Sequence, residues 1–179
     1  MDEAFNDVAM VSCALVLMAM LQMPFGPMAA LTGRSPGQQK WGERIFMNMT
    51  EQAPLFLTSL WAFALVVSPE RAASLGMIYL GLRALYAPIW LFAGGESGAP
   101  FPAILVSTFP QYGINVYFAL AVVLKVAFSM DITSFFMGSD KIGVIAVSFA
   151  FFVYAAGVIP KVHIALTCFF DKPAEDKKD

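Results

Sequence analysis

Long apolar runs, separated by short polar segments, make up nearly the whole chain. The first run extends from Val8 to about Leu31. About 20 apolar residues are enough to cross the roughly 30 Å of bilayer hydrocarbon as a helix. Pro24, Gly26 and Pro27 in the second half of the run predict a kink, because proline removes a backbone donor and clashes with the preceding turn.

Two helix-start patterns delimit the next helices. Ser35 is expected to act as an N-cap, with Pro36 at the first helical position and Gln38 completing a capping box. This second helix is expected to end near Val67. Ser68-Pro69-Glu70 repeats the pattern and leaves almost no loop, so the second and third helices are predicted to form an antiparallel hairpin.

The third helix is expected over about residues 69–93, before a glycine- and proline-rich break at 94–102. A fourth span follows at about 102–130. A fifth apolar run covers 142–170 and is interrupted by Pro160, Lys161 and His163. The predicted organisation is an acidic N-terminal end (1–7), a four-span bundle (8–130), an additional membrane helix (131–170) and a charged tail (171–179).

The composition is typical of an integral membrane protein. Of 179 residues, 59% are hydrophobic and only 13% are charged, which is too apolar for a soluble domain of this size. The fold class predicted is all-α integral membrane. A net charge of −2 without a basic block excludes nucleic acid as a partner. Two separated cysteines and a single histidine predict no metal site.

The distribution of basic residues indicates an orientation. With five spans, the loop that contains Arg34 and Lys40 lies on the same side as the tail with its three lysines, whereas Arg71 and Lys141 lie on the other. The positive-inside rule then places the first loop and the C-terminus on the cytoplasmic, matrix or stromal side of an endomembrane or organellar membrane.

A polar stripe occupies the start of the second helix. Arg44, Asn48 and Glu51 follow one another at i, i+4 and i+7, so they share one helical face. Ionisable groups at the mouth of a membrane helix are functional hypotheses by default. The alternative is a purely structural network between helices, in which each interaction contributes about 0.6 kcal/mol on average.

The third helix carries a second polar stripe. Arg83 lies well inside this span, where an unpaired arginine costs roughly 2.5–3.5 kcal/mol on insertion scales. Asn48 or Glu51 on the neighbouring helix are the expected partners. Tyr79, Tyr86 and Trp90 share the face of Arg83 at spacings of 4, 3 and 4, and Tyr79 and Trp90 are expected to be packing or interface residues.

Residues 42–90 resemble MAPEG, the membrane-associated proteins in eicosanoid and glutathione metabolism. One matching pattern is Arg, three residues, Asn, two residues, Glu, followed by Pro54-Leu55-Phe56; the other is Leu75-Gly76 followed by an arginine and a tyrosine. The resemblance implies a homotrimer of four-helix protomers with glutathione at the protomer interfaces. It also implies a transferase or peroxidase acting on lipophilic electrophiles, with glutathione bound by Arg44, Asn48, Glu51, Arg83 and Tyr86.

Three features depart from the family pattern. No Arg or Lys occurs between Trp90 and Tyr112, where relatives usually place an arginine that stabilises the glutathione thiolate. Trp90 stands where the leukotriene-type enzymes have tyrosine, and the fifth run lies outside the four-helix plan. No catalytic residue is therefore assigned. The second hypothesis is a catalytically silent accessory subunit of a larger respiratory or photosynthetic membrane complex.

Overall fold

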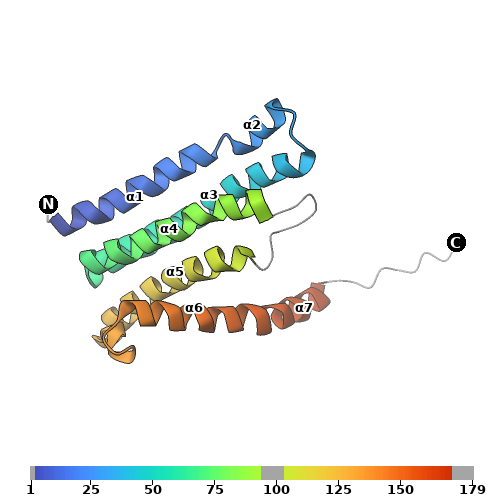
Figure 1. The fold of residues 1–179 in the computed structure, drawn as a ribbon. Coiled ribbons are helices and arrows are strands. Elements are labelled where there is room, and N and C mark those ends of the chain that lie inside the picture. The colour runs from blue at the N-terminus through green and yellow to red at the C-terminus, as the bar shows by residue number, and fades with distance from the viewer. Residues whose placement is uncertain (1–2, 94–102, 171–179) are drawn as a thin grey trace.

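The computed structural model describes residues 3–93 and 103–170, so the expected break at 94–102 and the charged tail at 171–179 lie outside it. Within these ranges all regular elements are helices, which run up and down beside one another (Figure 1). They are α1 (Glu3–Gln22), α2 (Phe25–Leu31), α3 (Pro36–Val66), α4 (Pro69–Ala93), α5 (Ala103–Phe128), the 3-10 helix η1 (Ile132–Phe135), α6 (Asp140–Gly157) and α7 (Ile159–Phe170).

The helix boundaries follow the start patterns of the sequence. The first apolar run is divided into α1 and α2 next to Pro24, as the kink prediction required. The Ser35 hydroxyl accepts a hydrogen bond from the Gln38 backbone N–H at 3.4 Å, which caps α3. Ser68 caps α4 by accepting from the Arg71 N–H at 3.2 Å, and α3 and α4 form the expected antiparallel hairpin.

The last apolar run is divided, where a single additional helix was predicted. Helix α6 ends at Gly157, and α7 begins two residues later with Pro160 in its first turn. Proline is tolerated there because the first-turn N–H groups have no intrahelical acceptor. The combined stretch Asp140–Ala165 is still long and apolar enough to cross a membrane.

Four stretches of the described chain meet the length and hydropathy of a membrane span: Glu3–Leu31, Pro69–Trp90, Leu105–Phe128 and Asp140–Ala165. The helix α3 is longer than any of them but starts with polar turns. Large apolar side chains on the outside, such as Leu17, Leu65 and Val126, are at least 61% exposed. An apolar exterior of this kind is typical of helices that face lipid.

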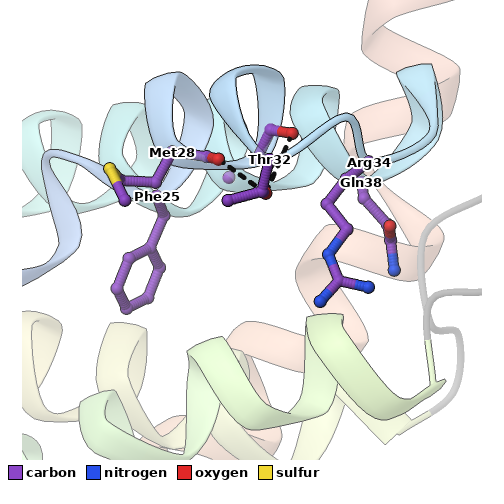
Figure 2. A pocket seen from close by; sticks show the side chains of 7 residues that line it. Phe25, Met28, Thr32, Arg34 and Gln38 are labelled. Carbon is purple, nitrogen blue, oxygen red and sulfur yellow. Dashed lines mark hydrogen bonds between the residues drawn. The ribbon is translucent and has the colours of Figure 1, made fainter.

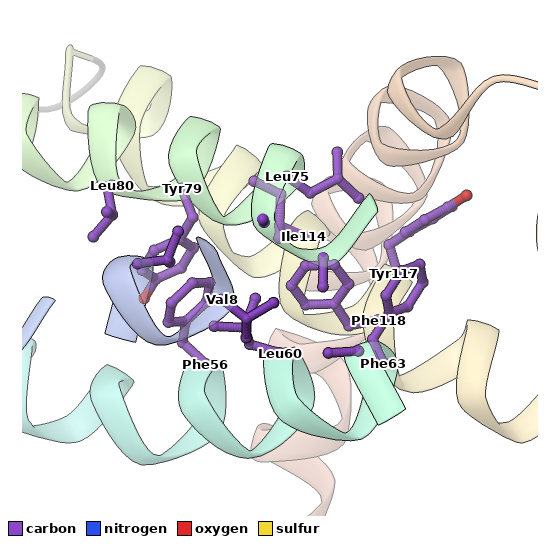
Figure 3. Close-up of a cluster of buried hydrophobic side chains, with 14 of the residues drawn as sticks. Val8, Phe56, Leu60, Phe63, Leu75, Tyr79, Leu80, Ile114, Tyr117 and Phe118 are labelled. Atoms are coloured by element: carbon purple, nitrogen blue, oxygen red, sulfur yellow. The ribbon is translucent and has the colours of Figure 1, made fainter. Parts of the chain in front are cut away.

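The core lies among α1, α3, α4 and α5 (Figure 3). The rings of Phe56 and Tyr79 stack with their centroids 3.7 Å apart, and the rings of Phe63 and Phe118 lie 4.8 Å apart. Val8 of α1 packs into the same cluster. Tyr79 is therefore a packing residue, as predicted, because it is fully buried against Phe56.

The short helix α2 lies directly on the first turns of α3. A Cβ atom placed on Gly42 would lie 2.5 Å from the backbone nitrogen of Gly26 and from the carbonyl carbon of Phe25. The two backbones are thus in van der Waals contact, a geometry that small residues permit in membrane helices. This crossing fixes the α2–α3 hairpin.

Candidate functional site

Arg83 is at the centre of a polar group inside the bundle. Its side chain extends from α4 and the residue is only 1% exposed. The Nη1 atom donates to Asn48 Oδ1 of α3 at 2.5 Å and, more weakly, to Gln111 Oε1 of α5 at 3.4 Å. The Nε and Nη2 groups are buried and have no hydrogen-bond partner in the described chain. Amide oxygens thus hold the guanidinium through Nη1, and the N–H groups of Nε and Nη2 have no acceptor among the described residues.

Asn48 is the partner of Arg83, so the alternative, Glu51, is wrong. Glu51 lies instead 3.7 Å from Arg44, and these two side chains are 48% and 49% exposed. At 100° per residue, Asn48 is rotated about 40° from Arg44 in one direction and Glu51 about 20° in the other. The stripe on α3 therefore faces two ways, with the amide inward and the ion pair outward.

Tyr86 completes the interior part of the site. The guanidinium carbon of Arg83 lies 4.5 Å from the centroid of the Tyr86 ring, a cation–π contact. Tyr86 belongs to a small buried cluster with Ile45 and Ala87, against which Phe25 and Trp90 pack. The structure thus brings Asn48, Arg83 and Tyr86 together, while Arg44 and Glu51 lie on the outer face of α3.

The helix α5 contributes polar groups that the sequence analysis did not assign to the site. Gln111 Nε2 donates to the carbonyl and hydroxyl oxygens of Ser107 at 3.0 and 2.8 Å, and the Ser107 hydroxyl donates to the Leu82 carbonyl of α4 at 2.7 Å. Gln52 of α3 donates to the Tyr112 hydroxyl at 2.9 Å. The i, i+4 spacing of Ser107 and Gln111 within an apolar span was the available signal.

The donor set suits an anionic ligand. Two parallel N–H groups of a guanidinium match the two oxygens of a carboxylate. The pairing of Arg83 within the described ranges involves amides only, which leaves its positive charge without a counter-ion. Buried charges are normally paired. The unpartnered N–H groups of Arg83 are therefore suited to a carboxylate or a similar anionic group.

A second charged cluster joins α4 to the C-terminal helices. Arg71 donates to Asp140 at 2.6 and 2.8 Å and to Asp131 at 2.8 and 3.2 Å. The Tyr117 hydroxyl of α5 also donates to Asp140, at 2.7 Å. In the sequence, Arg71 indicated only the orientation of the chain. The cluster instead ties the connection after α5 and the start of α6 to the bundle.

We expect the ion pair between Arg71 and Asp131 to weaken at low pH. The hydrogen bond from Arg71 holds the pKa of Asp131 well below its usual value, and the Thr133 N–H adds to the effect. A lowered pKa stabilises the folded state above the ordinary value of about 3.9, and this stabilisation is lost as the pH falls below it. The midpoint of thermal unfolding in detergent should fall between pH 6 and pH 3 by less in Asp131→Asn than in the wild type. An equal fall of the unfolding midpoint in Asp131→Asn and in the wild type would contradict the role given to Asp131.

The sequence model of the MAPEG family matches residues 8–120, which is more than half of the chain. The matched segment contains most of α1, all of α2 to α4 and most of α5, and it ends before η1 and α6. No curated protein and no solved structure matched the chain. Given its apolar helices and this match, the chain is an integral membrane protein that belongs to the MAPEG family.

Proposed function

We propose that the protein is a glutathione-dependent transferase or peroxidase that acts on a lipophilic electrophile dissolved in the membrane. The observation that carries this proposal is the Arg83 guanidinium, which is buried, held on one nitrogen by Asn48, and without a hydrogen-bond partner on its other two nitrogens among the described residues. A buried arginine without a counter-ion is costly in a membrane helix. A ligand carboxylate offsets this cost.

Each site residue has a role that its chemistry supports. Arg83 and Arg44 would take the two carboxylates of glutathione, because the guanidinium fork matches a carboxylate. Glu51 would take the ammonium, and Asn48 and Tyr86 would donate or accept locally. Glutathione would supply a thiolate as the nucleophile. Stabilisation of the thiolate would fall to Arg83 or the Tyr86 hydroxyl.

A homotrimer would complete this site. Arg44 and Glu51 form an ion pair on the outer face of α3, with about half of each side chain exposed. Charged groups in membrane helices normally face protein or water rather than lipid. A second copy against this face would cover the pair and make it part of a protomer interface. The proposed orientation places the first loop and the C-terminus on the cytoplasmic, matrix or stromal side.

Glutathione binding by the protein purified in mild detergent tests the proposal. We expect wild-type protein to bind glutathione at millimolar concentration or tighter, and Arg44→Ala and Glu51→Gln to bind about tenfold or more weakly, since a charge-assisted hydrogen bond contributes about 1.5–3 kcal/mol. Lys125→Ala, at the end of α5, is the matched control and should bind as the wild type does. Conjugation of a generic electrophile then tests activity. Absence of binding at millimolar glutathione would exclude the enzyme.

The second candidate is a catalytically silent accessory subunit of a respiratory or photosynthetic membrane complex. Two observations favour it. The helices α6 and α7 lie outside the family match, and Arg71 joins the start of α6 to the bundle. The segment between Trp90 and Tyr112 has no cation to stabilise a thiolate. Co-purification from native membranes in fixed stoichiometry with such a complex, without glutathione binding, would support this candidate.

A further inference from the structure

A groove lined by a single cationic side chain lies between α2 and the first turns of α3 (Figure 2). Its volume is about 460 Å³, within the range of small-molecule sites. Apolar groups form most of its wall, and no acidic residue lines it. The lining residues are Phe25, Met28, Ala29, Thr32, Arg34, Gln38 and Gly42.

The backbone at the polar end of the groove is held in place. Gly33 adopts φ +65°, a left-handed conformation that glycine adopts without strain. The Arg34 N–H donates to the Ala29 carbonyl at 2.9 Å, and the Arg34 carbonyl accepts from Gln39 Nε2 at 2.9 Å. The base of the Arg34 side chain is therefore fixed by a turn that belongs to the fold.

The guanidinium of Arg34 is free for a ligand. It makes no ion pair or side-chain hydrogen bond in the described ranges. The side chains of Phe25, Arg34 and Gln38 extend to the same side of the α2–α3 hairpin in Figure 2. Thr32, in contrast, uses its hydroxyl to donate to the Met28 carbonyl at 2.8 Å, so it adds little polarity.

The position of Arg34 decides what kind of anion it meets. The first candidate span ends at Leu31, three residues earlier, so Arg34 lies where the hydrocarbon gives way to headgroups. Guanidinium groups bind phosphate oxygens bidentately, and an amide such as that of Gln38 adds a donor. Phe25, Met28 and Ala29 continue from this point into the apolar depth of the membrane.

We propose that this groove is a specific site for a membrane phospholipid whose headgroup carries net negative charge. The headgroup phosphate binds Arg34 and Gln38, and an acyl chain lies along Phe25, Met28 and Ala29. Charge complementarity selects the anionic lipid, because the groove offers a cation and no acid. Phe25 also packs on the Tyr86 cluster, so the bound chain would support one wall of the Arg83 site.

Native mass spectrometry of the detergent-purified protein tests this site. Phosphatidylglycerol and phosphatidylcholine with identical acyl chains are added separately, and inorganic phosphate is the third probe. We expect the wild type to retain phosphatidylglycerol about fivefold over phosphatidylcholine, because both lipids carry the phosphate but only phosphatidylcholine adds a quaternary ammonium that the Arg34 charge repels. Arg34→Gln should remove the preference, and Ala29→Phe, which fills the groove, should weaken both lipids.

Lys40→Gln is the matched control, because Lys40 is an exposed cation in the first turns of α3 that does not line the groove. It should keep the wild-type preference. An equal loss in Lys40→Gln and Arg34→Gln would overturn the proposal in favour of general surface charge. Absence of any preference in the wild type, or displacement of the lipid by equimolar inorganic phosphate, would also overturn it. Arg34→Gln decides the matter even if Ala29→Phe does not fold.

Discussion

Replacing Gly42 by alanine should lower the free energy of unfolding by about 2 kcal/mol, the usual cost of overpacking a tight contact. The added methyl group would lie 2.5 Å from two backbone atoms of α2, at Phe25 and Gly26. Backbone atoms cannot rotate away as a side chain can, so α2 has to move as a unit. Thermal or denaturant unfolding in detergent measures the change.

Gly81→Ala is the matched control for this prediction. Gly81 also lies inside a helix, α4, but a Cβ atom there would have no neighbour within 4 Å. Alanine is favoured over glycine in a helix interior by up to about 1 kcal/mol. Gly81→Ala should therefore be neutral or stabilising. Equal destabilisation by the two substitutions would show that the α2–α3 contact is not responsible.

Replacing Arg71 by leucine should weaken the packing of the start of α6 against the bundle. The substitution leaves Asp131 and Asp140 without the cation that both accept from, and the Asp140 side chain is only 18% exposed. Removal of one partner of a buried ion pair costs about 3–5 kcal/mol, and partial exposure here lowers the expected cost to about 2 kcal/mol. The loss should appear as faster hydrogen exchange across α6, with less change in α1.

Two variants separate charge from geometry in this cluster. Arg71→Lys keeps the charge and loses the paired contacts to both carboxylates, so its effect should be intermediate. Lys141→Gln removes a neighbouring cation that makes no ion pair in the described chain, and it should leave exchange in α6 unchanged. Exchange across α6 that is the same in Arg71→Leu and the wild type would contradict the role given to Arg71.

Local sequence patterns predicted the helices because their causes are local. Ser35 and Ser68 each precede a proline at a helix start, and both cap the helices expected of them. The division next to Pro24 follows from the missing N–H and the clash of the ring. Pro160 has the same chemistry, and its presence indicated an interruption of the last run but not the end of one helix and the start of another at Val158.

The site was only partly predictable because it depends on rotation and on partners from distant helices. A shared face at i, i+4 and i+7 placed Arg44, Asn48 and Glu51 together, yet differences of a few tens of degrees send Asn48 inward and the ion pair outward. Gln111 reaches Arg83 from 28 residues away in the chain. Such a contact depends on how α5 packs against α4, and no local pattern encodes it.

The Arg71 cluster also sets an order of events during synthesis. Arg71 is made 60 residues before Asp131 and 69 residues before Asp140, so the first helices enter the membrane before this arginine has any counter-ion. In this chain, an arginine inside the family match therefore obtains both of its carboxylate partners from residues that follow the match.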